Sequence, residues 1–289
     1  MLKIGIKSIG YFSYQKNEVE GLIKAKEHGY DCLDYGEFSS PDSVVLNLPM
    51  DKYEAYLRWL KKQADKVGIM FNQAHGLWFM DEKNLKEREY NIECYKKQII
   101  GCSFLGCPNL VIHPCCPGGW IWSGDKMDDR QASFQGNMEV IKAILPTAKE
   151  YGVTICLENL PIINYSLTHT ADVKEIVSTI CDANVKVCLD LGHANVMGED
   201  LYETVTMLGD DLRCLHIHDN NGVSDLHSIP YCGNMDWELF LRGLKEINFQ
   251  GVISLETVIP TKMPEPMKSN MQRCLADIAH YFALKASNE

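Results

Sequence analysis

The chain lacks a long hydrophobic run, since no stretch of apolar residues approaches the ~20 that a membrane-spanning helix needs. Its first ten residues, MLKIGIKSIG, are too short and too interrupted by lysine for a signal peptide, and they read instead as a β-strand. Zinc-ribbon spacing is also absent from the twelve cysteines, most of which lie singly in expected strands and helices. We therefore expect reduced thiols in a cytoplasmic protein. The adjacent pair Cys115 and Cys116 offers soft ligands or a redox pair, but buried free thiols are the favoured interpretation.

Positive charge is scarce. The 39 acidic residues outnumber the 28 basic ones and give a formal net charge of −11. Because contacts to phosphate supply much of the affinity for DNA, this composition argues against a nucleic-acid partner and favours a small-molecule one. Phosphate-binding loops are missing too: SIGYFSYQ, after the first expected strand, is not a Gly-rich turn, and GGWIWSGD lacks the Walker lysine and serine.

What the chain does have is a regular alternation of apolar runs of strand length with longer amphipathic stretches. Several of the runs, such as LVIH, TICLE and VKVCLD, are nearly continuous in apolar character, as expected for strands buried on both faces of a parallel sheet. Gly ends several of the helical stretches, as in EHGY and EYGV. The expected strands cover residues 3–8, 32–36, 69–74, 110–113, 154–158, 186–190, 213–218 and 252–256. The expected helices include residues 17–28, 52–66, 86–105, 135–151, 171–178 and 267–284.

Eight β/α units in 289 residues match a (β/α)₈ TIM barrel of the α/β class in both number and length. No linker or low-complexity segment interrupts the pattern, so one domain over residues 1–289 is expected. The alternative is an open doubly wound sheet. That fold would place a Gly-rich phosphate turn after the first strand, where this chain has none.

Polar side chains close most of the expected strands. In a barrel, functional residues come from the carboxyl ends of the strands and from the loops that follow them, so these side chains are expected on one rim. His216 and His218, two residues apart, point to the same side of their strand. The rim residues with metal-binding side chains are His75, His113, Glu158, Asp190, His193, His216, Asp225, His227 and Glu256.

Taken singly, each of these residues fits a structural role: a histidine in a hydrogen bond, a carboxylate in a salt bridge or at a helix N-cap, or a D-x-H that braces its loop. Together they are harder to explain that way. Buried carboxylates are costly unless paired or bound to metal, and Lys and Arg are nearly absent next to them along the chain. A divalent metal would supply the missing positive charge. Trp78, Trp120 and Trp122 in neighbouring loops either wall a sugar ring or fill the loops.

The motifs LENL, LDLGHAN, LHIHDN, DLHSIPYCGNMDW and ISLET resemble those of the xylose-isomerase-like TIM-barrel superfamily. This group holds sugar isomerases and epimerases, inosose dehydratases and the apurinic-site endonucleases. The resemblance to its ketose 3-epimerases implies one divalent metal held by Glu158, Asp190, His216 and Glu256, with His193 on substrate oxygens. Gly222 stands where those epimerases have a substrate-binding Arg, which departs from the free-ketohexose pattern.

The apurinic-site endonucleases provide the alternative, a zinc-cluster phosphodiesterase. All nine rim residues match the ligands of their three-zinc cluster, but the loops here are not basic and do not resemble the DNA-penetrating ones. A second metal would then involve His75, His113, His193, Asp225 and His227.

The prediction from the sequence is thus a metal-dependent isomerase or epimerase of a carbohydrate or polyol, with dehydration also open. Glu158 and Glu256 are the expected catalytic acid and base, and the metal is Mn²⁺, Mg²⁺, Co²⁺ or Zn²⁺. His218 is assigned to the surroundings of the site. The sequence leaves the sugar, its phosphorylation and a homo-oligomeric state undecided. The residues expected to bind substrate are His193, Asp225, His227, Trp120 and Trp122.

Overall fold

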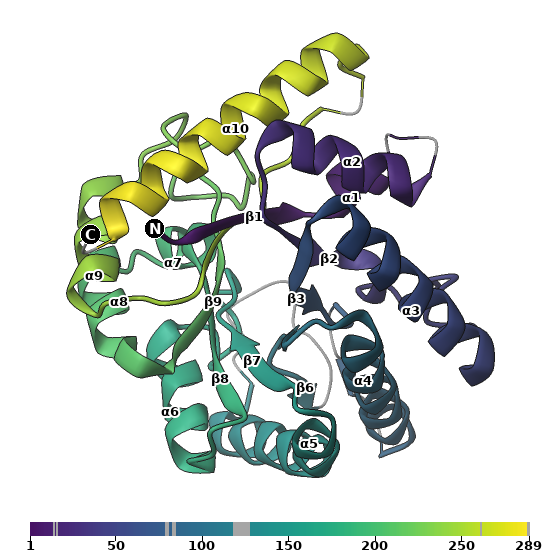
Figure 1. Ribbon diagram of the computed structural model, residues 1–289. Helices are drawn as coiled ribbons and strands as arrows, with labels where there is room; N and C mark the ends of the chain where they lie inside the picture. Colours follow the sequence, from purple (N-terminus) through teal and green to yellow (C-terminus); the bar gives the residue numbers. More distant parts are fainter. Residues whose placement is uncertain are drawn as a thin grey trace.

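Eight parallel strands form a ring with the helices outside it (Figure 1). The computed structural model describes residues 1–13, 15, 17–78, 81–82, 85–117, 128–260 and 262–287. The sheet runs in the order β10-β1-β2-β3-β5-β7-β8-β9, and its two ends meet where Ile217 N–H donates to the Ser254 carbonyl and Glu256 N–H donates to the Ile217 carbonyl, both at 2.9 Å. The predicted TIM barrel is confirmed, and the open doubly wound sheet is wrong. The strands of the ring are β1 (Lys3–Lys7), β2 (Cys32–Tyr35), β3 (Met70–His75), β5 (Asn109–Ile112), β7 (Thr154–Glu158), β8 (Val185–Asp190), β9 (Leu212–His216) and β10 (Val252–Leu255).

The helices follow the strands in turn and bury one face each against the sheet. In α3 the buried residues Tyr53, Leu57, Leu60 and Ala64 recur every three or four positions, the spacing of one helical face. Two of the predicted glycine stops adopt left-handed backbone, Gly29 after α2 with φ of 106° and Gly152 after α5 with φ of 65°. The helices are α1 (Ile9–Phe12), α2 (Glu18–His28), α3 (Met50–Val67), α4 (Leu85–Leu105), α5 (Arg130–Tyr151), α6 (Thr170–Ile180), α7 (Leu191–Val196), α8 (Leu201–Leu208), α9 (Trp237–Glu246) and α10 (Glu265–Ala286), with 3₁₀ turns η1 (Gly36–Phe38) and η2 (Gly209–Asp211).

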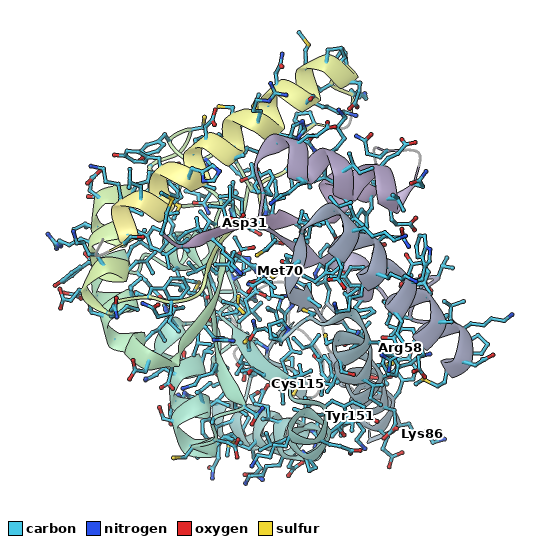
Figure 2. All side chains as sticks on the ribbon, viewed as in Figure 1. Asp31, Arg58, Met70, Lys86, Cys115 and Tyr151 are labelled. Carbon is cyan, nitrogen blue, oxygen red and sulfur yellow. The ribbon has the colours of Figure 1, made fainter. Side chains whose placement is uncertain are left out.

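Side chains fill the space that the ring encloses (Figure 2). Part of this interior is a small cluster of Val111, Cys156, Cys188 and Cys214, all completely buried. Burial raises the pKa of the Cys188 thiol well above its usual value, so this side chain behaves as a small apolar group. All twelve cysteines are free thiols, as predicted. Within the described part of the chain, no helix has both the length and the apolar character to cross a membrane.

Two local features were not predicted, and both lie at the mouth of the barrel, the end where the carboxyl ends of the strands meet. The two-residue strands β4 (Asp81–Glu82) and β6 (Cys116–Pro117) pair in parallel and tie together the loops that follow β3 and β5. Helix α7 begins directly after β8, and the side chain of Asp190 caps it by accepting a hydrogen bond from His193 N–H at 2.7 Å. A strand of two residues is too short to show a hydrophobic periodicity. Helix α7 is also short, and its segment was expected to be part of the loop after β8.

Candidate metal centre and active site

The polar residues predicted at the strand ends converge at the carboxyl-end mouth of the barrel. Four of them, His75, Glu158, Asp190 and His216, are the last residues of β3, β7, β8 and β9. The parallel pairing places Asp190 directly beside His216. His113 and Glu256 stand one position beyond β5 and β10, and all six side chains are buried.

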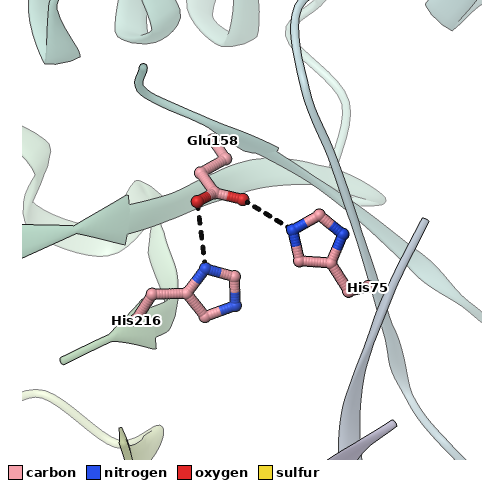
Figure 3. A group of neighbouring side chains, drawn as sticks. All are labelled: His75, Glu158 and His216. Carbon is pink, nitrogen blue, oxygen red and sulfur yellow. Dashed lines mark hydrogen bonds and ion pairs between the residues drawn. The ribbon is translucent and has the colours of Figure 1, made fainter. Parts of the chain in front are cut away.

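The centre of this group is His216. Its Nδ1 lies 3.0 Å from Glu158 Oε1, 2.8 Å from Glu256 Oε2 and 3.9 Å from Asp190 Oδ2. One ligand atom from each of the four residues lies within 4.8 Å of the others. Figure 3 shows Glu158 between two histidines, with one oxygen toward His216 and the other toward His75. Three carboxylates therefore surround one imidazole, and all four side chains are buried.

Both glutamates are held in the ionised form in the metal-free protein. Burial opposes the charge of Glu158, but His216 and His113 outweigh it and keep its pKa well below the usual value. The pKa of Glu256 is likewise lowered, because His216 and Lys7 outweigh its burial. Ionised carboxylates packed this closely create an environment that favours a cation.

Three histidines at the mouth point their Nε2 atom toward a carboxylate. His75 Nδ1 donates to the carbonyl of the next residue, His193 Nδ1 to that of Asn159 and His227 Nδ1 to that of Glu256, each at 2.8 Å. These bonds place a proton on Nδ1 and leave Nε2 facing a carboxylate, where it can bind a cation once it carries no proton. Histidine ligands of metals are usually fixed by this kind of outer hydrogen bond.

His216 has a different outer partner, which the sequence reasoning missed. Its Nε2 lies 3.2 Å from Oδ2 of Asp34, a buried carboxylate near the end of β2. Asp34 also accepts a hydrogen bond from Gln73 Nε2 at 3.3 Å, and the same amide donates to the Leu215 carbonyl. The position of Asp34, one residue before the strand end, was the available signal.

A second group of ligand atoms lies beside the first. Asp225 Oδ2 is 3.3 Å from His193 Nε2 and 3.1 Å from His227 Nε2. His218, assigned from the sequence to the surroundings, belongs within this group. Its Nε2 lies 3.1 Å from Asp190 Oδ1 and 3.5 Å from Asp225 Oδ1, and its ring stacks on that of His227 with centroids 4.0 Å apart. Asp225 and His227 form the D-x-H motif of the sequence. They stabilise their loop through the hydrogen bond from His227 to the Glu256 carbonyl, and they also belong to this second group of candidate ligands.

The expectation that cations are missing from the rim is wrong at one position. Lys7, the last residue of β1, forms a buried ion pair with Glu256. The two residues lie far apart in the chain, but β1 and β10 are neighbours, with Ile6 opposite Leu255. The sequence near Glu256 gives no sign of this pair, because its cation comes from the other end of the chain. The available signal was the position of Lys7 at the end of the first strand.

The mouth opens into a cavity of about 340 Å³ whose walls include Trp78, Glu158, His193 and His227. Trp78, after β3, is 46% exposed and presents its ring to this space. Trp120 and Trp122, predicted to contact substrate, lie outside the described residues. The site thus combines an acidic centre, imidazoles and one aromatic wall.

The donor set fits a divalent cation. Ligand atoms that share one ion at about 2.0–2.6 Å lie within about 5 Å of each other. The four residues Glu158, Asp190, His216 and Glu256, which form the main group of donors, meet this condition. The three carboxylates and one imidazole of this group suit Mn²⁺, Co²⁺ or Zn²⁺ without choosing among them. His75 and His113, whose Nε2 atoms lie 3.4 Å and 3.2 Å from Glu158 Oε2, extend the donor set on the far side of Glu158.

Comparison with known proteins is consistent with this architecture. A family model described as a xylose isomerase-like TIM barrel matches residues 22–277. An uncharacterized protein of Methanocaldococcus jannaschii is 33% identical over 266 residues, which is 88% of this chain and 83% of that protein. The D-psicose 3-epimerase of Agrobacterium fabrum is 25% identical over 262 residues, 87% of this chain and 84% of the epimerase.

A solved structure with the same fold is that of the IOLI protein with a bound zinc atom. It superimposes with a TM-score of 0.76 at 21% identity and covers 99% of this chain and 98% of the other. At this identity the likeness establishes the fold.

Proposed function

The chain belongs to the xylose isomerase-like TIM barrel family, and we propose that it is a divalent-metal-dependent isomerase or epimerase of a sugar or polyol. The observation that carries the proposal is the convergence of Glu158, Asp190, His216 and Glu256 within 4.8 Å at the barrel mouth. The likeness to a D-psicose 3-epimerase over most of both chains supports the reaction class.

Glu158 and Glu256 suit the movement of a proton next to a carbonyl. They come from β7 and β10 and approach His216 from separate strands. As ionised carboxylates, either can accept a proton from a substrate carbon. Removal by one glutamate and return to the opposite face by the other gives epimerisation, whereas return to the adjacent carbon gives aldose–ketose isomerisation.

A divalent ion bound by the main group would polarise the substrate carbonyl and stabilise the enediolate. His193, Asp225 and His227 line the same cavity and would hold substrate hydroxyls. The aromatic face of Trp78 would pack against the carbon skeleton and keep water from the reacting carbon.

Metal analysis of the purified protein tests the proposal. One tightly bound divalent ion per chain is expected, with activity lost on chelation and restored by adding the ion back. Substitution Asp190→Asn should lower the metal content, whereas the surface substitution Asp200→Asn should leave it unchanged. A protein that turns over its sugar equally well after complete chelation contradicts the metal-dependent mechanism.

The second candidate is a zinc-cluster phosphodiesterase acting on abasic DNA. It is favoured by the second group of donors, in which His218, Asp225 and His227 place their ligand atoms within 4.8 Å of one another. Three zinc ions per chain together with cleavage of a duplex that contains an abasic site would replace the isomerase assignment. The net charge of −11 is unfavourable for binding a polyanion.

A further inference from the structure

A second cavity adjoins the one at the metal centre. Its volume is about 490 Å³, and it lies between the ends of β1 and β10. Trp78, His227 and Glu256 line both cavities, so the two spaces meet at these three side chains. A molecule chelated at the centre therefore has a direct way into the second space.

The walls of the second cavity are mainly apolar. Ile6, Ile9, Val258 and Ile259 line it together with one side of Trp78. Val258 is 62% exposed and Ile9 is 45% exposed, so this face remains open to a ligand from solution. Exposed aliphatic side chains around an aromatic ring are typical of a site for an apolar group.

Polar side chains also line the cavity, among them Lys7, Ser13, Ser39, Thr257 and Gln272. Lys7 is occupied by its ion pair with Glu256, so it is not available to hold an anionic group. Thr257 Oγ1 is buried and has no hydrogen-bond partner among the described residues. Thr257 Oγ1 can donate a hydrogen bond to an ether oxygen of a neutral ligand, near the point where its apolar group is attached.

The volumes indicate that this space exceeds what a simple sugar needs. The cavity at the centre, at about 340 Å³, already falls within the range of small-molecule sites, roughly 300–1,000 Å³. A free monosaccharide chelated there would leave the adjoining 490 Å³ to water against apolar walls. Filling it with an apolar group would remove that surface from water and contribute to binding.

We propose that the second cavity is a subsite for a neutral, apolar substituent of the substrate, so that the enzyme acts on an ether of a ketose, aldose or inosose, with the carbonyl left free, rather than on the unsubstituted compound. This inference rests on the proposed function for the identity of the sugar end. The apolar subsite itself depends only on the cavity.

Gly10, in α1, provides a way to close the subsite. It lines the cavity, and a Cβ added to it would meet no atom within 4 Å, so this position accepts the first carbon of a side chain, and we expect that of Gly10→Leu to occupy part of the cavity. Val258→Asp provides an independent second variant, because it places a charge on the apolar wall. Ala132→Leu, on the exposed face of the first turn of α5, adds an equal side chain at a position that lines neither cavity.

Binding of benzyl alcohol, measured by ligand-observed NMR on the full chain, tests the subsite without any sugar. We expect saturable binding to the native protein, at least tenfold weaker binding to the Gly10→Leu and Val258→Asp variants, and unchanged binding to the Ala132→Leu variant. Circular dichroism of each variant confirms its fold. Absence of binding to the native protein, or equal binding to the Gly10→Leu variant, overturns the proposal.

A second comparison links the subsite to the reaction. Each ketose, aldose or inosose screened for proton exchange is offered both free and as a benzyl ether at a hydroxyl away from the carbonyl, which keeps the carbonyl free, and the benzyl ether is expected to have the higher kcat/KM. A free sugar that is exchanged as well as its benzyl derivative overturns the substrate class. If no compound exchanges while benzyl alcohol binds as expected, the proposed function fails and the apolar subsite stands.

Discussion

Glu158 and Glu256 carry the proposed chemistry, and each can be replaced by glutamine at almost constant size. Glutamine cannot accept the proton, so each variant should lose roughly 10²–10⁴-fold in kcat. Thermal melts and metal analysis of both variants separate loss of chemistry from loss of the fold or the ion. Turnover of the true substrate by both variants would show that the two-carboxylate mechanism is wrong.

Lys7 and Glu256 form a buried ion pair, with side chains 12% and 8% exposed. Replacing Lys7 by methionine leaves the carboxylate without its cation, and breaking a buried pair typically costs about 3 kcal/mol in the free energy of unfolding. The loss should be smaller when a divalent ion neutralises Glu256. Denaturant melts with and without metal measure both values, with Lys3→Met at the other end of β1 as the control. An equal loss in the two states would place Glu256 outside the metal site.

If the second group, His218, Asp225 and His227, binds zinc, then His227 makes that binding dependent on pH. Burial disfavours its charged form, but Asp225 and Glu256 outweigh burial and raise its pKa to about 9. At neutral pH the metal-free ring is therefore protonated, and a cation must displace that proton. Affinity should rise with pH up to about 9, by roughly tenfold per unit for each proton released.

Calorimetric zinc titrations between about pH 6.5 and 8.5 measure this slope. The variant His227→Asn has no proton to release at this position and should reduce the slope by about one proton. A slope that is the same in the variant and in the native protein would remove His227 from the zinc ligands.

Much of the candidate site could be predicted because a strand's last residue can be read from the sequence. His75, Asp190 and His216 were placed at strand ends in this way, and each ends a strand of the ring. Lys7 and Asp34 were missed because their contacts, with Glu256 and His216, run across the sheet between distant segments. The role of each residue in catalysis stays a prediction.

Among the elements, α7 combines a helix cap with a candidate metal ligand in one side chain. Asp190 accepts a hydrogen bond from His193 N–H with Oδ1, while Oδ2 faces the metal group. Asparagine caps helices as well as aspartate does, but alanine does not, at a cost of about 1 kcal/mol. Asp190→Asn should therefore keep the stability of the metal-free protein and lower metal affinity, whereas Asp190→Ala should lower both.

Asp200→Ala, which removes the cap of α8, is the matched control: it should lower stability and leave metal affinity unchanged. Chemical denaturation and metal titration of the three variants give the comparison. Full metal affinity in Asp190→Asn would reduce Asp190 to a helix cap.

At the level of elements, the sequence predicted the strands of the ring and most long helices, because their hydrophobic periodicity is strong and glycine marks several ends. The boundaries moved by a few residues, as in α5, which begins at Arg130 rather than at residue 135. The pair β4–β6 and helix α7 depend on contacts at the mouth, which local periodicity does not reveal.

At the scale of the whole molecule, the ring brings side chains from β1, β2, β3, β7, β8, β9 and β10 to one mouth. The barrel could be predicted from the number of its units, since eight parallel strands in 289 residues suit few other arrangements. The juxtaposition of Lys7 with Glu256 required closure of the ring, and the second cavity required the packed loops. Neither property belongs to any single segment.

Incorporation of solvent deuterium into a carbohydrate is the decisive test of the proposed isomerase or epimerase activity. The metal-loaded protein is incubated in D₂O with ketoses, aldoses and inososes and with their benzyl derivatives, and the recovered compounds are analysed by NMR. We expect deuterium at a carbon next to the carbonyl of one substrate, and no deuterium there after chelation or in the Glu158→Gln variant. No exchange in any compound, with a duplex containing an abasic site cleaved by the same zinc-loaded preparation, would contradict the proposed activity.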